Sequence, residues 1–181
     1  MTNMRRASPL SATVLLTLFA TGCASTPCKI KAATANVDLK ACRTICVKAA
    51  TAADGVVVPT NVLSQATNSV ASRLQASGKF DAVYTHPCPA GEKAAHVVML
   101  YTSYRPGSRI QRWLLIGTGT ADLKMNVQLA DEGEEQVLGQ GNVHEFWGWG
   151  GLLGASRGIE EMQDTACKHV AEGIVEACTA R

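Results

Sequence analysis

The stretch ADLKMNVQLA, residues 121–130, decides the fold class, because apolar and polar side chains alternate along it without interruption. A period of two residues is typical of a β-strand that turns one face to a core and the other to water. The apolar set is Ala121, Leu123, Met125, Val127 and Leu129, and the polar set is Asp122, Lys124, Asn126 and Gln128. The stretch therefore predicts one strand of a sheet that is covered on a single face.

Further strands are expected on both sides of this one. Residues 95–104 form a continuous apolar run of strand length, which predicts a buried central strand. Residues 136–146 are expected to return from a turn at Asp131-Glu132-Gly133 as an antiparallel partner, with Gly139 and Gly141 marking a bulge or a close backbone approach. Shorter strands are expected over 44–48 and 80–85.

Two helical stripes complete the pattern. The first follows Pro59 and is expected to end at Gly78, and the second reaches the C-terminus. Their apolar positions are Leu63, Ala66, Val70 and Leu74 in the first, and Ile159, Met162, Ala166, Val170, Ile174 and Ala177 in the second. The order β-α-β-β-β-β-α predicts an α+β domain, with an antiparallel sheet of about four to five strands covered by two helices.

Charge gives little indication of a partner. The 181 residues carry 17 Lys+Arg and 15 Asp+Glu, and two of the cations, Arg5 and Arg6, lie in an N-terminal stretch that is typical of a cleaved signal. Without that stretch the chain is neutral, so its charge gives no reason to expect nucleic acid as a partner. An apolar fraction of 46% argues against disorder, and no apolar run is long enough to span a membrane.

Residues 1–22 have the three parts of a secretory signal: Arg5 and Arg6, an apolar core over 10–19, and small residues before Cys23. Ala20-Thr21-Gly22-Cys23 resembles the bacterial lipobox. That resemblance implies that Cys23 becomes the acylated first residue, and that Ala24, which is not an acidic retention signal, permits transport to the outer membrane. We therefore expect a lipoprotein signal peptide over 1–22, a tether over 23–41 and a single α+β domain over 42–181.

The cysteine count suits a secreted protein. Assigning Cys23 to lipid leaves six disulfide candidates: Cys28, Cys42, Cys46, Cys88, Cys167 and Cys178. Cys167 and Cys178 lie eleven residues apart in one predicted helix, which is about 16 Å along its axis and too far for a bridge. We favour a bond from Cys42 or Cys46 to Cys28 or to a helix cysteine. Free buried thiols and a metal site of cysteines and histidines are the alternatives.

The motifs of common enzyme classes are missing from the sequence, among them the phosphate-binding loops, the helical zinc-protease motif and the nucleophile elbow. The four histidines, His86, His96, His144 and His169, stand apart from one another. His144 and Glu145 are neighbours in a predicted strand, so their side chains are expected on opposite faces. We expect neither a catalytic site nor a metal or other cofactor. A Cys/His site is the rival interpretation, but a disulfide would remove its nucleophile.

Two loops are candidate binding surfaces. Residues 105–113 hold Arg105, Arg109 and Arg112 beside an indole, which suits an anionic envelope component, or else pairing with the acidic tip Glu132, Glu134 and Glu135. Residues 146–155 hold Trp147, Trp149, Leu152 and Leu153 among glycines, which indicates either an interface or a cap over the core.

The stretch from Gly107 to Gly173 resembles the DUF4410 family of bacterial envelope lipoproteins. The features that carry the resemblance are Gly107-Ser108-Arg109, Arg112-Trp113, Gly117-Thr118-Gly119, the strand end Leu129-Ala130-Asp131, and a glycine-rich loop before the closing helix. The resemblance implies a fold and a location more than an activity.

Together these observations predict a lipoprotein on the periplasmic side of the outer membrane, with a non-enzymatic binding or envelope-assembly role. Its expected partners are the membrane, through the lipid anchor, and an envelope protein or further copies of the chain. The alternative is a periplasmic hydrolase that uses a Cys/His site.

Overall fold

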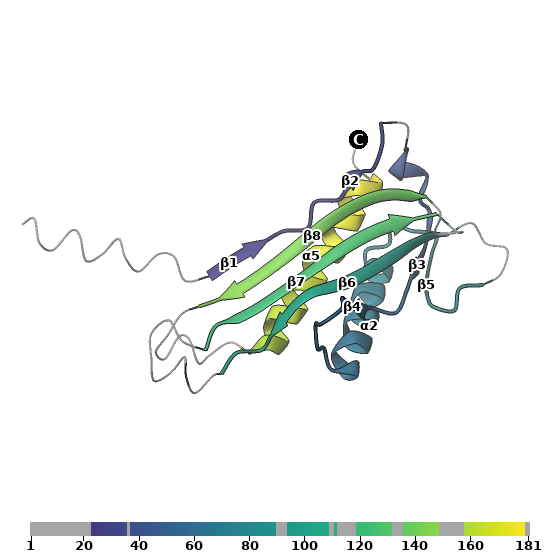
Figure 1. The fold of residues 1–181 in the computed structure, drawn as a ribbon. Coiled ribbons are helices and arrows are strands. Elements are labelled where there is room, and N and C mark those ends of the chain that lie inside the picture. Colours follow the sequence, from purple (N-terminus) through teal and green to yellow (C-terminus); the bar gives the residue numbers. More distant parts are fainter. Residues whose placement is uncertain are drawn as a thin grey trace, which may run out of the picture.

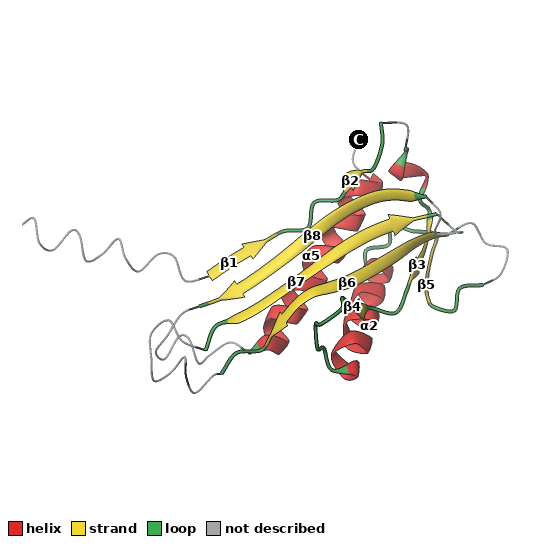
Figure 2. Ribbon diagram, in the orientation of Figure 1, coloured by secondary structure: helices red, strands yellow, loops and turns green. Residues whose placement is uncertain are grey.

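A computed structural model describes residues 23–35, 37–89, 94–108, 111, 119–131, 136–148 and 158–179. In these residues one twisted sheet is backed by two long helices (Figure 1). The helices are α2 (Thr60–Ala76) and α5 (Ile159–Thr179), and both lie on the same face of the sheet (Figure 2). The described residues also contain a short 3-10 helix, η2 (Leu39–Ala41). None of these three helices covers the central strands on the opposite face of the sheet (Figure 2).

The sheet has eight strands among the described residues, in the order β1-β8-β7-β6-β3-β5, with β2 also paired to β8 and β4 to β6. Their bounds are β1 (Cys23–Thr26), β2 (Lys31–Ala32), β3 (Thr44–Val47), β4 (Thr51–Ala52), β5 (Ala82–Thr85), β6 (Ala95–Arg105), β7 (Ala121–Ala130) and β8 (Val137–Trp147). The α+β class and the two covering helices are therefore confirmed, but the sheet has more strands than predicted.

The prediction of an antiparallel sheet is wrong for one half of it. Strands β6, β7 and β8 form an antiparallel meander, whereas β3 runs parallel to both β5 and β6, and β4 runs parallel to β6. The reason is the long connection between β3 and β5. A helix returns the chain to the end where the first strand began, so the second strand runs in the same direction. The crossover through α2 thus accounts for the parallel pairing of β3 with β5.

The alternation in β7 is confirmed. Leu123, Met125, Val127 and Leu129 are completely buried under the helices, while Lys124, Asn126 and Gln128 are exposed on the other face. A bulge in β6 at Thr102 places Tyr101 and Tyr104 on the core side, where their rings meet edge to face. The core thus lies between one sheet face, here called the inner face, and the helices; the opposite face is called the outer face.

Residues 23–32, which the sequence predicts as part of a tether, run instead along the free edge of β8 as β1 and β2. Cys28 is only 3% exposed, because two glycines make room for it. A Cβ at Gly141 of β8 would lie 3.1 Å from Cys28 Sγ, and a Cβ at Gly173 of α5 would overlap the Cys28 carbonyl. The close approach predicted at Gly139 and Gly141 is confirmed, and its partner is the N-terminal segment.

Candidate functional site

The outer face of the sheet carries a polar hollow of about 510 Å³ over the middle of β7 and β8. Two pairs of amide side chains stand directly opposite each other there, Asn126 with Asn142 and Gln128 with Gln140. Lys31, which is paired with Gln140, and Lys29 extend the hollow to the sheet edge. No carboxylate lines it. This set, here called the amide–lysine hollow, offers hydrogen-bond donors and acceptors together with two positive charges.

These amides are open to an external ligand. Within the described ranges, no residue donates to or accepts from the side chains of Asn126, Gln128, Gln140 and Asn142. An amide that supplies both a donor and an acceptor suits a hydroxyl or amide ligand, and an ammonium group suits an anion. The arrangement can therefore bind a polar or acidic molecule.

Beside the hollow, on the same face, Asp122 holds two partners. His144 Nε2 lies 2.7 Å from Asp122 Oδ1, and the Ser103 hydroxyl donates to Asp122 Oδ2 at 2.5 Å. Burial alone would raise the pKa of the Asp122 carboxyl, but the hydrogen bonds from Ser103 and His144 and the charge of nearby Lys124 outweigh it, so this pKa is lowered. The carboxylate is therefore held in its charged form on the outer face.

The next residue along β8 belongs to the inner face. Glu145 is 5% exposed, and its Oε1 lies 2.8 Å from the Ser25 hydroxyl and 3.0 Å from His169 Nδ1. These three residues come from β8, β1 and α5. The contacts tie the N-terminal strand to the C-terminal helix. They also confirm that His144 and Glu145 point away from each other.

The inner cluster consists of Glu145, Ser25 and His169, and the outer cluster consists of Asp122, Ser103 and His144. Neither cluster has the geometry of a catalytic triad. In a triad the imidazole uses one nitrogen for the carboxylate and the other for the nucleophile. In the inner cluster Ser25 and Glu145 both meet the same atom, His169 Nδ1. In the outer cluster the carboxylate of Asp122 lies between Ser103 and His144. Neither arrangement therefore places an imidazole with one nitrogen on the carboxylate and the other on the hydroxyl.

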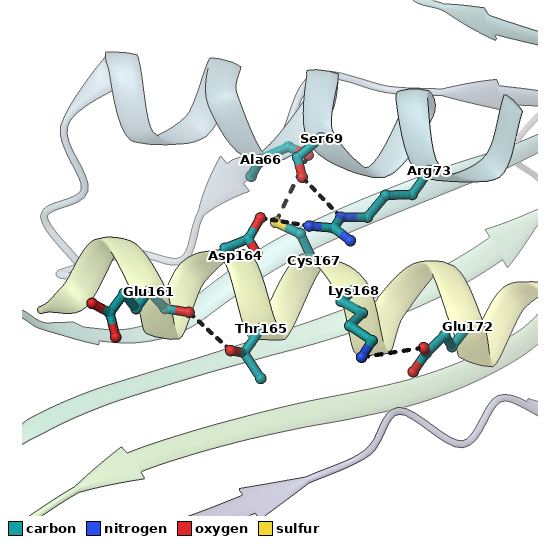
Figure 3. Close-up of polar contacts among 9 residues, drawn as sticks. All are labelled: Ala66, Ser69, Arg73, Glu161, Asp164, Thr165, Cys167, Lys168 and Glu172. Atoms are coloured by element: carbon teal, nitrogen blue, oxygen red, sulfur yellow. Dashed lines mark hydrogen bonds and ion pairs between the residues drawn. The ribbon is translucent and has the colours of Figure 1, made fainter. Parts of the chain in front are cut away.

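The seam between α2 and α5 holds a buried thiol beneath an ion pair (Figure 3). The Cys167 thiol is completely buried and contacts the Ser69 hydroxyl and the Ala66 carbonyl. Above it, Arg73 spans to Asp164 with an N–O distance of 2.5 Å. Burial is the main cause that raises the pKa of Cys167 to about 11. This thiol is therefore protonated at neutral pH and is a poor nucleophile.

Among the described residues one disulfide is present, between Cys46 and Cys88, with a Cα–Cα distance of 6.1 Å. Both are among the predicted disulfide candidates, but this pairing differs from the favoured bond, which runs from Cys42 or Cys46 to Cys28 or a helix cysteine. Cys46 is in β3 with its side chain on the outer face, away from α5, so it is joined to the segment after β5. His96 is the register partner of Cys46, and its ring nitrogen and the two sulfurs lie within 4.8 Å of one another. With the sulfurs bonded to each other, this group supplies neither thiolate ligands nor a nucleophile.

The described part of the chain also has thiols at Cys28, Cys42 and Cys178. Burial raises the pKa of Cys28 to about 11. Cys42 and Cys178 are in contact: a hydrogen bond from Cys178 lowers the pKa of Cys42, and the same contact, followed by burial, raises that of Cys178.

The structure describes only part of the two predicted binding loops. Arg105 ends β6 and is exposed, and Trp147 ends β8 and is half-buried. Both lie at the end of the sheet where β1 begins, since Trp147 is opposite Cys23 and Arg105 is opposite Asp122. Arg109, Arg112, Trp149, Leu152 and Leu153 lie outside the described residues.

Sequence reasoning missed the amide–lysine hollow and the Glu145 cluster. The polar side chains of β7 were identified as solvent-facing, but Lys29 and Lys31 were assigned to a tether. The glycines at 139 and 141 were the signal that another segment crosses β8.

Among the described residues, no helix has the length and apolar character needed to cross a bilayer.

A family model described as "Domain of unknown function (DUF4410)" matches residues 38–151, more than half of the chain. The predicted family is thereby confirmed, although the matched span begins well before Gly107 and ends before α5. A comparison with curated proteins finds no match.

Solved structures share the fold at low identity. A variant of PelC from Paraburkholderia phytofirmans, a dodecamer, is 13% identical with a TM-score of 0.56, over 87% of this chain and all of that one. A second PelC dodecamer from the same organism is 12% identical with a TM-score of 0.54, at the same coverage. A DUF330 protein from Xanthomonas campestris is 11% identical with a TM-score of 0.50, over 74% of this chain and 84% of that one. At these identities the likeness concerns the fold alone.

Proposed function

Because the chain belongs to the DUF4410 family, a domain of unknown function, we propose its role from its own geometry: a lipoprotein on the periplasmic side of the outer membrane, anchored through Cys23, with a non-enzymatic binding or assembly role. The observation that carries this proposal is the outer face of the sheet. It keeps a polar hollow free of helices, while every long helix in the described residues packs on the other side.

The start of β1 supports the anchor. Strand β1 pairs with β8 from its first residue, so an acylated Cys23 places its lipid at the end of the sheet that also holds Trp147 and Arg105. A tryptophan ring suits the membrane interface, and arginine suits anionic headgroups. The domain would then sit on the bilayer without a spacer, with its outer face directed sideways and accessible to a neighbour.

Labelling with palmitate and membrane fractionation test the anchor. Wild-type protein is expected to incorporate label and to sediment with the outer membrane, whereas Cys23→Ser is expected to lose the label and become soluble in the periplasm. A Cys23→Ser protein that still incorporates palmitate contradicts the anchor. Cys28→Ser is the matched control, because it removes a nearby thiol without touching the proposed lipid site.

Site-specific photocrosslinking in the native envelope tests the binding face. A photoreactive residue at Gln128, inside the amide–lysine hollow, is expected to give a discrete crosslinked species. The same photoreactive residue at Glu172, which is exposed on α5, is the control. Crosslinks from Glu172 alone, or equal patterns from both positions, would refute the proposal.

The role in assembly includes self-association as a second candidate. Two solved structures that share the fold are dodecamers, and this chain covers those structures in full. Native mass spectrometry of the Cys23→Ser protein is expected to show an oligomer; a monomer at all concentrations, together with a Gln128 crosslink to another protein, favours a hetero-partner instead.

The rival hydrolase interpretation needs a histidine beside a free thiol. The structure places His144 against Asp122, His169 against Glu145, and His96 against a sulfur pair already joined in a disulfide. These placements support a binding role over a Cys/His mechanism. A Cys88→Ser variant distinguishes the two, because opening the disulfide frees the Cys46 thiol beside His96. Hydrolytic activity that appears only in this variant would favour the rival.

A further inference from the structure

Cys42 and Cys178 lie near opposite ends of the domain's sequence, but they meet at one edge of the fold. Cys42 caps η2, directly before β3, and Cys178 lies in the last turn of α5. The short helix η2 packs against α5, and both cysteines join the hydrophobic core there. Their thiols share a hydrogen bond although the two residues lie far apart in the sequence. Two thiols in contact need little movement to form a bond.

The two remaining thiols are placed differently. Cys28 is enclosed between Gly141 and Gly173, and Cys167 faces the Ser69 hydroxyl across the helix seam (Figure 3). Both are buried, at 3% and 0% exposure, and each contacts backbone or hydroxyl groups of other elements. We propose that Cys42 and Cys178 form the second disulfide of the mature protein beside Cys46–Cys88, and that Cys28 and Cys167 remain thiols.

The reactivity of the pair has a direction. Cys42 is half-buried and its pKa is lowered, whereas Cys178 is buried and its pKa is raised. Because the thiolate is the attacking species, Cys42 is the thiol that reacts first with an external oxidant. The more exposed position of Cys42 gives the oxidant access.

The oxidant is a disulfide, either that of a thiol oxidase or a small-molecule disulfide such as oxidised glutathione. The Cys42 thiolate attacks one sulfur of that disulfide, and the other sulfur leaves as a thiolate. The Cys178 thiolate then attacks Cys42 Sγ and releases the first sulfur of the oxidant. Two electrons pass to the oxidant disulfide, and the two protons of the Cys42 and Cys178 thiols end on the released thiolates or in water. In the cell this step depends on the secretion proposed above.

Counting thiols in the denatured protein tests the pairing. A Cys23→Ser protein, refolded in a buffer of oxidised and reduced glutathione, is denatured with a maleimide and without reductant, and its mass is measured. Two labels are expected, on Cys28 and Cys167, and six after reduction. Four labels, or none, would overturn the proposal, as would a digest that links Cys42 or Cys178 to any other cysteine.

Single substitutions separate the pair from its neighbours. Cys42→Ser and Cys178→Ser are each expected to show three labels and a melting temperature lower by about 5–15 °C, a difference that disappears when all proteins are reduced. Cys167→Ser is the matched control from the same helix and is expected to show one label. Since refolding in glutathione needs no secretion, failure of the pairing is distinguished from failure of the proposed location, which fractionation tests.

Discussion

His144 and Glu145 are neighbours on β8, yet they belong to the two different faces of the sheet. His144 lies on the outer face with Asp122 and Ser103, beside the amide–lysine hollow. Glu145 is buried on the inner face and joins β1 to α5 through Ser25 and His169. Each group therefore contains one carboxylate, one histidine and one serine, but the inner group joins β1 and β8 to α5, whereas the outer group joins three neighbouring strands, β6, β7 and β8, on the uncovered face. The inner face therefore stabilises the domain, and the outer face is available for binding.

The largest effect is expected from shortening a side chain on the inner face. Leu123→Ala removes a completely buried side chain between β7 and the helices, and it should lower the free energy of unfolding by about 2–5 kcal/mol. Gln128→Ala, five positions along the same strand on the outer face, should change it by less than about 0.5 kcal/mol. Urea unfolding measures both. Equal losses from the two variants would remove the distinction between the faces.

The next effect concerns the N-terminal segment. Gly173→Ala should destabilise the protein by about 1–3 kcal/mol, because the added methyl group overlaps the Cys28 carbonyl. Helix propensity alone predicts the opposite sign, since alanine is the better helix former. Denaturant unfolding gives the sign, and faster maleimide labelling of Cys28 shows that the segment has been displaced. Glu172→Ala, at the exposed neighbouring position, is the control and should change stability little.

Patterns within a single strand or helix were predictable from the sequence, whereas contacts between elements that lie far apart in the sequence were not. The strand 121–130 and both helices followed from the spacing of Leu123, Met125 and similar residues, because burial repeats with the local period. The parallel pairing of β3 was missed, although the intervening helix implies it. The packing of Cys28 could not be read from residues 23–32, because that segment has no periodicity and the space for it is made by glycines in β8 and α5.

Buried polar contacts on the inner face give the third effect. Glu145→Gln keeps the shape but removes the charge that meets Ser25 and His169, and it should cost about 1–3 kcal/mol of unfolding free energy. Hydrogen exchange measures the local result: protection of the β1 amides should fall more than that of β7. If Asp122→Asn on the outer face loosens β1 to the same extent, the inner cluster is not what holds the N-terminal strand.

The outer carboxylate should appear in the pH dependence of stability. The pKa of Asp122 is lower in the folded protein than its ordinary value of 3.8, so the folded state favours the charged form. Its contribution is therefore present above about pH 4 and is lost as the pH falls through the lower, folded value. Wild type should exceed Asp122→Asn in melting temperature at pH 6, and the difference should narrow between pH 4 and pH 2. A difference that stays constant over this range would contradict the assignment.

The smallest effect is expected from ion pairs that belong to neither face. Asp81 pairs with Arg43 at 3.3 Å beside the edge strand β5, and Asp164 pairs with Arg73 across the helix seam. Both carboxylates are more than half exposed, so water screens them and each pair should contribute only about 0.2–1 kcal/mol. Asp81→Asn and Asp164→Asn should therefore have similar small effects at low ionic strength, and these should vanish at 1 M NaCl, where the screening length is about 3 Å. If Asp164→Asn alone loses stability and the loss persists at 1 M NaCl, the ion pair over Cys167 is part of the packed seam between α2 and α5. The stabilising side of the domain would then extend from the inner face through the helices to their solvent side.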